Sequence, residues 1–221
     1  MNNRIRHHIF PKIILFAALL IFCGNASFPH RAYGQNTELD LAQAAQQSGT
    51  FTTLVSTQSD PVGQEGLWGL EGHFLVPHSC THSYKALKDV EKYPQRTKAV
   101  KRVKLLERNP TSVVVEYTEG AFGLESTSTM LWTFNEGKNS SSITTTTIGP
   151  DDPPSWVQIK LLPVKEQSYC NIHVRMFADL SWAPQFILSW MSSMAGEELE
   201  ASYREIIESA APESQSVPHK N

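Results

Sequence analysis

The stretch VPHSCTHSYKALKDVEKYPQRTKAVKRVKLLER, residues 76–108, sets the expected fold of this 221-residue chain. Three apolar residues inside it recur at the spacing of one helical face, which predicts a short amphipathic helix: Tyr84, Leu87 and Val90. Tyr93-Pro94 then ends the helix, because a residue that precedes proline is biased toward extended conformations. The alternating, lysine-rich segment that follows predicts a strand.

Elements on both sides of this stretch extend the pattern. Residues 67–76 alternate apolar and polar side chains, which is typical of a half-buried strand. The segment after Pro94 and the β-branched runs that follow it predict about six strands, separated by turn residues. The last element is a long helix from about Trp182 to Ser209 with a wide apolar stripe. Strands followed by a long helix indicate an α+β fold, an antiparallel sheet with helices on one face.

The first 34 residues have the pattern of a secretory signal. A positively charged start precedes 11 apolar residues, Ile13–Cys23. This run is too short to span a bilayer, which needs roughly 20 apolar residues. We expect cleavage after Gly34, with Ala26 as the alternative site, and an uncleaved anchor is the other interpretation. The protein is therefore expected to be periplasmic or secreted.

The rest of the chain divides into three parts. Residues 35–66 contain few apolar side chains and predict a flexible N-terminal segment, residues 67–209 form the expected domain, and residues 210–221 form a disordered tail. Removing the signal removes four basic residues and no acidic residue, so the formal net charge changes from −3 to −7. An acidic chain argues against a nucleic-acid partner.

The order of elements resembles the START-like helix-grip superfamily (SRPBCC), which includes polyketide cyclase/dehydrase-type and coenzyme Q-binding proteins. The resemblance lies in the quoted stretch, with its D-x-x-x-Y-P and V-K-x-V-x-x-L-x-R patterns, and in the long C-terminal helix preceded by W-x-P. It covers about residues 67–209. It implies a curved antiparallel sheet of about seven strands wrapped around the C-terminal helix, with a short helical segment after the first strand.

A curved sheet gripped by one helix leaves room for a ligand cavity between them. The candidate lining residues are large apolar side chains on the predicted helices and strands: Tyr84, Leu87, Val90, Met130, Trp132, Phe134, Met176, Phe186, Trp190 and Met194. Each of them taken alone is more simply explained as core. Together, flat aromatic rings and adaptable methionines suit a lipid or polyisoprenoid tail. The resemblance implies that the first helix and the segment after Pro94 gate the entrance.

The resemblance also implies a disulfide between Cys80 and Cys170. In the resembled fold the first and last strands pair antiparallel, which brings the end of one beside the start of the other. Such a bond closes a loop of roughly 90 residues and contributes about 3–5 kcal/mol when unstrained. Two buried free thiols are the alternative.

We expect no catalytic residue, no metal site and no cofactor. The segment HSCTH, residues 78–82, offers two histidines at helical spacing, but no third ligand is evident nearby. There is no GxSxG motif and no titratable pair that divides acid and base roles. Glu116 alternates against the apolar residues of its strand, so we expect it to face solvent.

Six basic residues follow the predicted helix and form a candidate membrane or partner patch: Lys92, Arg96, Lys98, Lys101, Arg102 and Lys104. Lysines on a solvated strand edge commonly protect against aggregation. The functional interpretation is a docking patch for an anionic membrane surface or for an acidic partner.

The sequence therefore predicts an exported protein that binds a hydrophobic small molecule, such as a lipid, a polyisoprenoid or a polyketide-like compound, without transforming it. Two alternatives remain open. One is a cyclase or hydratase-type enzyme that acts in the same cavity, and the other is a cell-envelope interaction protein with a filled core.

Overall fold

The computed structural model describes residues 40–121, 124–137, 140–165, 168–180 and 185–210, without the side chains of Ala121, Leu124 and residues 185–193. The predicted signal, residues 1–34, lies outside the described residues, and so does the expected tail from residue 211 onward. Among the helices of the described part, none is long and apolar enough to cross a membrane.

The described residues contain five helical segments and eight strands, with six consecutive strands before the last helix. The helical segments are α1 (Leu41–Gln47), α2 (Cys80–Lys88), the 3-10 helix η2 (Val90–Lys92), α3 (Tyr93–Arg96) and α4 (Gln185–Ser209). The strands are β1 (Thr50–Val55), β2 (Trp68–Val76), β3 (Val100–Asn109), β4 (Ser112–Ala121), β5 (Leu124–Glu136), β6 (Ser141–Thr147), β7 (Ser155–Pro163) and β8 (Cys170–Ala178).

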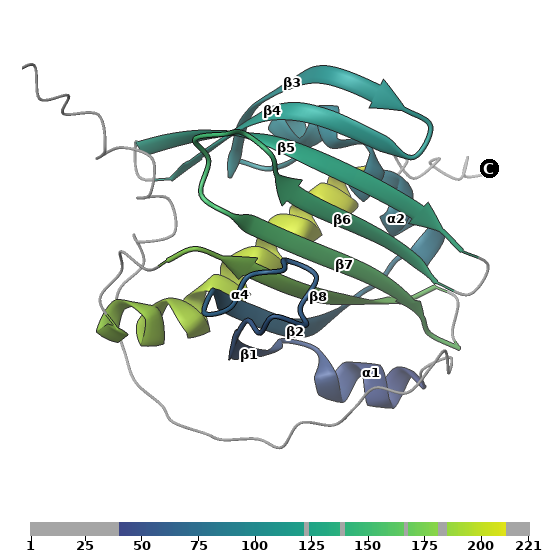
Figure 1. Cartoon of the computed structure of the whole chain (residues 1–221). Coiled ribbons are helices and arrows are strands. Elements are labelled where there is room, and N and C mark those ends of the chain that lie inside the picture. Colours follow the sequence, from purple (N-terminus) through teal and green to yellow (C-terminus); the bar gives the residue numbers. More distant parts are fainter. Residues whose placement is uncertain (1–39, 122–123, 138–139, 166–167, 181–184, 211–221) are drawn as a thin grey trace, which may run out of the picture.

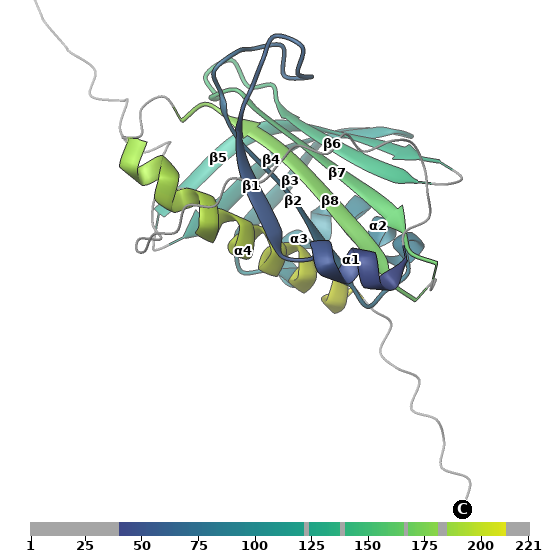
Figure 2. The same cartoon turned by 90° about the horizontal axis from the view of Figure 1, so that it is seen from below.

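All eight strands form one antiparallel sheet in the order β1-β2-β8-β7-β6-β5-β4-β3. The sheet curves, and α4 runs along its concave face (Figures 1 and 2). β2 pairs with β8 in the sheet interior, while β1 and β3 form its two open edges. The predicted α+β helix-grip architecture is confirmed, with one strand more than expected.

The additional strand lies in the segment that we expected to be flexible, residues 35–66. β1 pairs along its whole length with β2, from Thr50 opposite His73 to Val55 opposite Trp68. The ring of Phe51 fits against two glycines: a Cβ on Gly72 would lie 2.3 Å from the ring, and a Cβ on Gly196 of α4 would lie 2.5 Å from it. Because Gly72 and Gly196 have no side chain, the Phe51 ring fits between them and β1 packs against β2 and α4. The folded unit therefore begins before residue 67.

The helix expected to run to Tyr93-Pro94 instead ends early. α2 ends at Lys88, and Tyr93 has the helical dihedrals φ −55° and ψ −41°. Pro94 then lies in the first turn of α3, where its missing N–H has no helical partner to lose. The fully buried Tyr93 hydroxyl donates a hydrogen bond to the Leu87 carbonyl at 2.7 Å, which holds this turn against α2.

Most of the core lies between the concave face of the sheet and the helices. It joins residues of α2, of α4 and of the seven strands β2 to β8 into one cluster that includes Leu87, Trp132 and Ile207. A smaller cluster of Leu67, Trp156 and Phe177 lies on the convex face. Helices therefore cover one face of the sheet, and the concave side is where a ligand would meet both sheet and helix.

A disulfide joins Cys80, the first residue of α2, to Cys170, the first residue of β8. Ser79 caps α2 by accepting a hydrogen bond from the His82 N–H at 3.2 Å. The disulfide therefore fixes the start of α2 to β8, an interior strand of the sheet.

Candidate ligand-binding site

The concave face of β4 changes character along the strand. Val113 and Val115 are buried, whereas Tyr117 and Glu119, which share their face, keep part of their surface accessible. Side chains two residues apart on a strand point to the same side, so these four follow one line across the interior. The interior is therefore filled at one end of β4 and more open at the other.

The same change occurs on β5, the neighbouring strand. Trp132 and Phe134 are buried, while Met130, Ser128 and Ser126 keep accessible surface. The register places Ser128 opposite Tyr117 and Ser126 opposite Glu119. Residues that lie opposite each other in an antiparallel pair project to the same face, so both serines join the open end.

Helix α4 repeats the pattern. Ile206 and Ile207 near its C-terminus are buried, whereas Tyr203, Leu199 and Met194 are partly accessible. All three contributing elements thus keep some accessible surface toward the same end of the concave face, while Tyr117, Met130, Leu199 and Tyr203 still pack against the core cluster. We call the accessible interior residues Tyr117, Glu119, Ser126, Ser128, Met130 and Tyr203 the open half.

The opposite end is closed by α2 and η2. Tyr84, Leu87 and Val90 are at most 3% exposed, and they pack in the same cluster as Trp132 and Phe134. The edge of Tyr93 meets the face of Trp132 at a centroid distance of 5.6 Å. These five expected lining residues form a packed end wall, and their side chains leave no accessible surface for the entrance that we expected there.

The remaining expected lining residues are more dispersed. Met176 is buried in a neighbouring cluster with Trp68, Leu70 and Leu180. Met194 is partly accessible on α4, and the side chains of Phe186 and Trp190 lie outside the described residues. Of the ten expected residues, Met130 is the one that falls within the open half.

Glu119 is the notable side chain of the open half. Burial raises the pKa of its carboxyl to about 7, although the side chain keeps some accessible surface. No hydrogen bond joins this carboxyl to another group in the described part of the chain. A carboxyl with this pKa is about half protonated near pH 7 and largely neutral below about pH 6, and in its neutral form it has a proton to donate to a ligand.

Two tyrosines share the environment of Glu119. Burial raises the pKa of the Tyr117 and Tyr203 hydroxyls, and the charge of Glu119 adds to the effect on both. Neither hydroxyl makes a hydrogen bond within the described residues. Three convergent polar groups without partners thus lie among apolar walls, an arrangement typical of a pocket that orients a ligand by one polar end.

Sequence reasoning missed Glu119. The signal was present, because Glu119 continues the alternation of Val113, Val115 and Tyr117. Glu116, which we expected to face solvent, lies on the opposite face and pairs with Arg102 at 3.3 Å. The strand thus carries one acidic residue on each face, and only Glu119 is inside.

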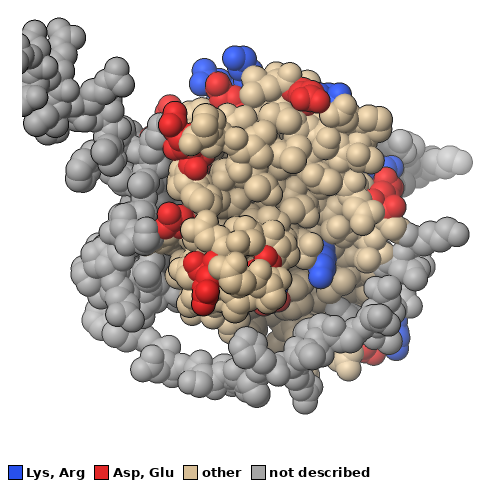
Figure 3. Space-filling view, viewed as in Figure 1, with Lys and Arg blue, Asp and Glu red and all other residues tan. Residues whose placement is uncertain are grey.

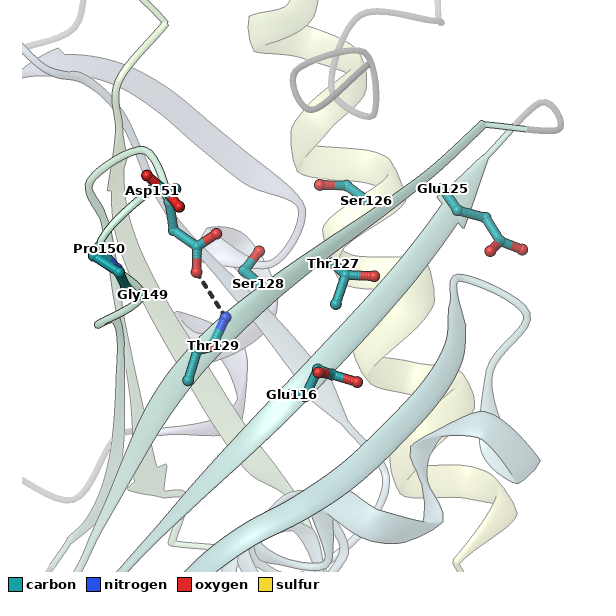
Figure 4. A pocket seen from close by; sticks show the side chains of 10 residues that line it. Glu116, Glu125, Ser126, Thr127, Ser128, Thr129, Gly149, Pro150 and Asp151 are labelled. Carbon is teal, nitrogen blue, oxygen red and sulfur yellow. Dashed lines mark hydrogen bonds between the residues drawn. The ribbon is translucent and has the colours of Figure 1, made fainter. Parts of the chain in front are cut away.

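A pocket of about 450 Å³ opens where β5 runs past the end of β6 (Figure 4). Asp152 of the β6–β7 loop accepts a hydrogen bond from the Thr129 N–H at 2.7 Å and closes one side of it. Its lining residues come from both faces of β5, since Ser126 and Ser128 face the interior and Thr127 faces the opposite side. The pocket therefore lies beside the open half.

The expected basic patch is only partly assembled. Arg96 is 16% exposed, forms an ion pair with Asp89 at 2.8 Å and donates to the Ala86 carbonyl, so it joins α3 to α2 instead of facing a partner. Lys92, Lys98, Lys101, Arg102 and Lys104 are exposed. A groove of about 580 Å³ lies beside Lys98 and Lys101, but Glu205 and Glu208 form its other wall.

The histidines of the HSCTH segment have a structural role. His82 Nε2 lies 3.1 Å from the Ile207 carbonyl and connects α2 to α4, and the His78 ring lies 4.9 Å from that of His82. Within the part of the chain that the structure describes, no group of three or more His, Cys, Asp or Glu side chains is placed to hold a metal ion.

A second polar cluster lies on the convex face. His173 lies 2.7 Å from Glu71 and stacks on His73, while Arg175 forms an ion pair with Asp60 of the β1–β2 loop at 2.7 Å. Burial lowers the pKa of His73 to about 4, so this ring is neutral at physiological pH. The cluster fixes the loop to the sheet and does not face the open half.

Comparison with known proteins identifies the fold. No family model matches the chain, and no curated protein matches it in sequence. Three solved structures illustrate the similarity. Human StAR-related lipid transfer protein 5 is 14% identical with a TM-score of 0.57, and the match covers 72% of this chain and 81% of that one.

The lipid transfer and protein localization domain of human StarD13 is 12% identical with a TM-score of 0.54, covering 78% of this chain and 94% of that one. A START superfamily protein from Mycobacterium smegmatis is 15% identical with a TM-score of 0.51, covering 65% and 99%. At these identities the similarity establishes the fold. The chain has the START-like helix-grip fold, as the sequence predicted.

Proposed function

We propose that this chain binds a hydrophobic small molecule between the sheet and α4, with the polar end of the molecule held by Glu119, Tyr117 and Tyr203. The observation that carries the proposal is the open half itself. Interior residues of β4, β5 and α4 keep some accessible surface at the same end, and a carboxyl with a pKa of about 7 lies there.

The chemistry of the open half favours a ligand with an uncharged polar end. A protonated Glu119 donates a hydrogen bond to a hydroxyl or carbonyl oxygen, and each tyrosine hydroxyl donates or accepts one more. A ligand carboxylate would instead meet a group that ionises near pH 7. Solved structures of the same fold include human StAR-related lipid transfer protein 5, whose name is in keeping with a lipid-like ligand.

We propose that the ligand enters through the pocket beside β5. β6 ends before it covers the first half of β5, which leaves an opening between β5 and the β6–β7 loop. Ser126 and Ser128 contribute to both the pocket and the open half. This route replaces the entrance expected at α2, where the side chains are closely packed.

A pair of variants on β5 tests the site. Ser128→Phe places a ring in the open half, whereas Thr133→Phe places the same ring on the exposed opposite face of the same strand. The probe is a fluorescent sterol with a free hydroxyl, titrated into delipidated protein. We expect the first variant to weaken binding by roughly 10-fold or more, since the lost contacts amount to a few CH₂ groups, and the second to leave it unchanged. Equal affinities in all three proteins, or no binding by the unmodified protein, would contradict the proposal.

A second candidate function, a cyclase or hydratase-type enzyme, is favoured by the same carboxyl. A group with a pKa near the working pH is suited to act as a general acid or base. The Glu119→Gln variant separates the two functions, because an amide still forms hydrogen bonds but cannot transfer a proton. If the purified protein changes the mass of its bound molecule over time and this variant does not, the enzyme is the correct assignment.

We also propose that the protein is exported and works in the periplasm or outside the cell. The signal pattern of residues 1–34 and the disulfide between Cys80 and Cys170 support this, since disulfides persist in oxidising compartments. Mass spectrometry of the protein from fractionated cells tests it. The expected form starts at Gln35 and is found outside the cytoplasm, and an intact N-terminus in the cytoplasmic fraction would exclude export.

A further inference from the structure

The free edge formed by β3 carries two kinds of side chain that rarely occur together on an exposed strand. β3 is the last strand of the sheet and pairs with β4 alone. Three lysines, the first of them just before β3, are followed by two adjacent leucines within nine residues, and we call the set Lys98, Lys101, Lys104, Leu105 and Leu106 the β3 rim. At about 3.3 Å per residue, the part of the β3 rim that lies on the strand extends for roughly 20 Å.

The three lysines of the β3 rim are exposed, and none has an ion-pair partner among the described residues. The neighbouring arginines are engaged, since Arg102 pairs with Glu116 and Arg108 pairs with Glu91. In Figure 3, Lys and Arg at the margin where β3 lies stand beside Asp and Glu, while the centre of the same face carries few charges. The β3 rim thus places three lysines without an ion-pair partner among the described residues on a chain with a net negative charge.

The two leucines are exposed because of the strand geometry. The register changes between Leu105, which lies opposite Val115, and Glu107, which lies opposite Val114, so Leu106 is an inserted residue. Leu105 is 36% exposed and Leu106 is 48% exposed. Large exposed apolar side chains elsewhere in the described part of the chain are Val55 and Ile148, which lie far from each other in sequence.

Protection against aggregation explains the lysines but not the leucines. Lysines on a free edge discourage pairing with another strand, whereas adjacent exposed leucines favour association. A lipid bilayer with anionic headgroups is a partner that uses both, because lysines contact phosphates while leucines enter the boundary of the acyl chains. A flat surface that meets the sheet edge-on contacts side chains from both faces of the edge strand at once.

We propose that the β3 rim docks the protein on an anionic membrane surface. This surface is separate from the ligand site, because the open half lies between β4, β5 and α4 and its polar groups point inward. Glu107 and Glu116, acidic residues on or beside the strand, are bonded to Asn109 and to Arg102. Glu205 and Glu208 of α4 lie across the groove from Lys98 and Lys101. None of these four carboxylates forms an ion pair with the three lysines in the described part of the chain, so the lysines can still contact phosphates. The test therefore gives an answer whether or not the ligand proposal is correct.

Co-sedimentation of the purified protein with vesicles tests the docking surface. One set of vesicles contains phosphatidylglycerol in phosphatidylcholine, and the other contains phosphatidylcholine alone. We expect binding to the anionic set, weakened by salt. The triple variant K98Q/K101Q/K104Q is expected to lower the partition coefficient by roughly 100-fold, since each lysine near an anionic surface contributes about a factor of five.

Matched control variants distinguish binding through the β3 rim from non-specific attraction by any exposed lysine or apolar residue. K85Q/K160Q/K165Q removes three exposed lysines from other elements and is expected to change binding by less than about threefold, on the same scale. L105S/L106S is expected to lower binding at least about 10-fold, since each buried methylene contributes roughly a factor of four, while V55S/I148S leaves it unchanged. Absence of binding to anionic vesicles, or an equal loss in test and control variants, overturns the proposal. Circular dichroism confirms that each variant is folded.

Discussion

Glu119 is the titratable residue on the interior face of β4, which otherwise carries Val113, Val115 and Tyr117. Its carboxyl is desolvated by burial, which raises its pKa to about 7 from an ordinary value of 4.5. The folded protein therefore binds more protons than the unfolded chain between these two values. This group stabilises the fold at low pH relative to high pH, and the contribution is lost as the pH rises through about 7.

Replacing Glu119 with Gln should consequently have a pH-dependent effect on stability. Near pH 8 the wild-type carboxylate is ionised in a poorly hydrated place, so the variant should melt about 2–6 °C higher, given roughly 2–4 °C per kcal/mol for a chain of this size. Near pH 4.5 both side chains are neutral in the folded state and the melting temperatures should agree. Differential scanning calorimetry at both pH values measures this.

The control for this prediction is Glu116→Gln, which alters the carboxyl on the opposite, solvent-facing side of the same strand. The difference in melting temperature between this variant and the wild type should not change between pH 4.5 and pH 8 in that way. A Glu119→Gln variant that melts at the wild-type temperature near pH 8 would show that the carboxyl is well hydrated and that water fills the open half.

At the level of single residues, the sequence predicted which face of a strand a side chain takes but not how deeply it is desolvated. Alternation places Glu119 with Val115 and Tyr117. Its raised pKa depends on burial against other elements, including α4, whose Tyr203 feels its charge. No pattern in one sequence specifies which residue of a distant helix packs over which strand position.

Among the elements, β1 is a strand that the hydrophobic pattern of its own segment did not predict, because its packing depends on glycines elsewhere in the chain. The segment around Phe51 has little apolar content, and it docks because Gly72 and Gly196 leave space for one ring. A helix interior normally disfavours glycine by about 1 kcal/mol relative to alanine. Gly196 is therefore expected to be present for packing and not for helix formation.

The Gly196→Ala variant tests this contact, because its effect on the free energy of unfolding should change sign when Phe51 is removed. In the wild type the new Cβ would lie 2.5 Å from the Phe51 ring, so we expect a loss of about 1–3 kcal/mol in the free energy of unfolding. In a Phe51→Ala background the same change should be neutral or stabilise by up to about 1 kcal/mol, because alanine is the better helix former. Urea denaturation of the four proteins gives the coupling energy, and a stabilising effect in the wild type would refute the contact.

The element boundaries were predicted well where periodicity is strong and poorly around Tyr93-Pro94. The bias of a pre-proline residue toward extended backbone is a local preference. Here it is outweighed by burial of the Tyr93 ring against Trp132 and by the hydrogen bond from its hydroxyl to Leu87. Local preference of about 1 kcal/mol is easily exceeded by the burial of one aromatic side chain.

On the scale of the whole molecule, the disulfide between Cys80 and Cys170 connects parts of the chain that are 90 residues apart. Closing a loop of this length restricts the unfolded chain and contributes about 3–5 kcal/mol. We expect the Cys80→Ala/Cys170→Ala double variant to melt roughly 10 °C lower than the oxidised wild type. Thermal denaturation measures the difference, and non-reducing mass spectrometry that finds two free thiols in the exported protein would remove its basis.

The global fold was predictable because the order of strands and helices, with a long amphipathic last helix, admits few arrangements. The ligand site was less predictable. Large apolar residues such as Leu87, Trp132 and Phe134 have the same signature whether they fill a core or line a cavity, and the structure places these three in the packed end. What marks the open half is incomplete packing, a property of the assembled elements.

The central claim, that a hydrophobic molecule is held between the sheet and α4, is tested most directly by native mass spectrometry of the protein purified without detergent or lipid. We expect a species heavier than the bare chain by one small molecule, lost on extraction with organic solvent and absent from the Ser128→Phe variant but present in Thr133→Phe. A protein that has only the mass of its chain, and that gains no mass after incubation with a lipid extract of its own cells, would contradict the claim.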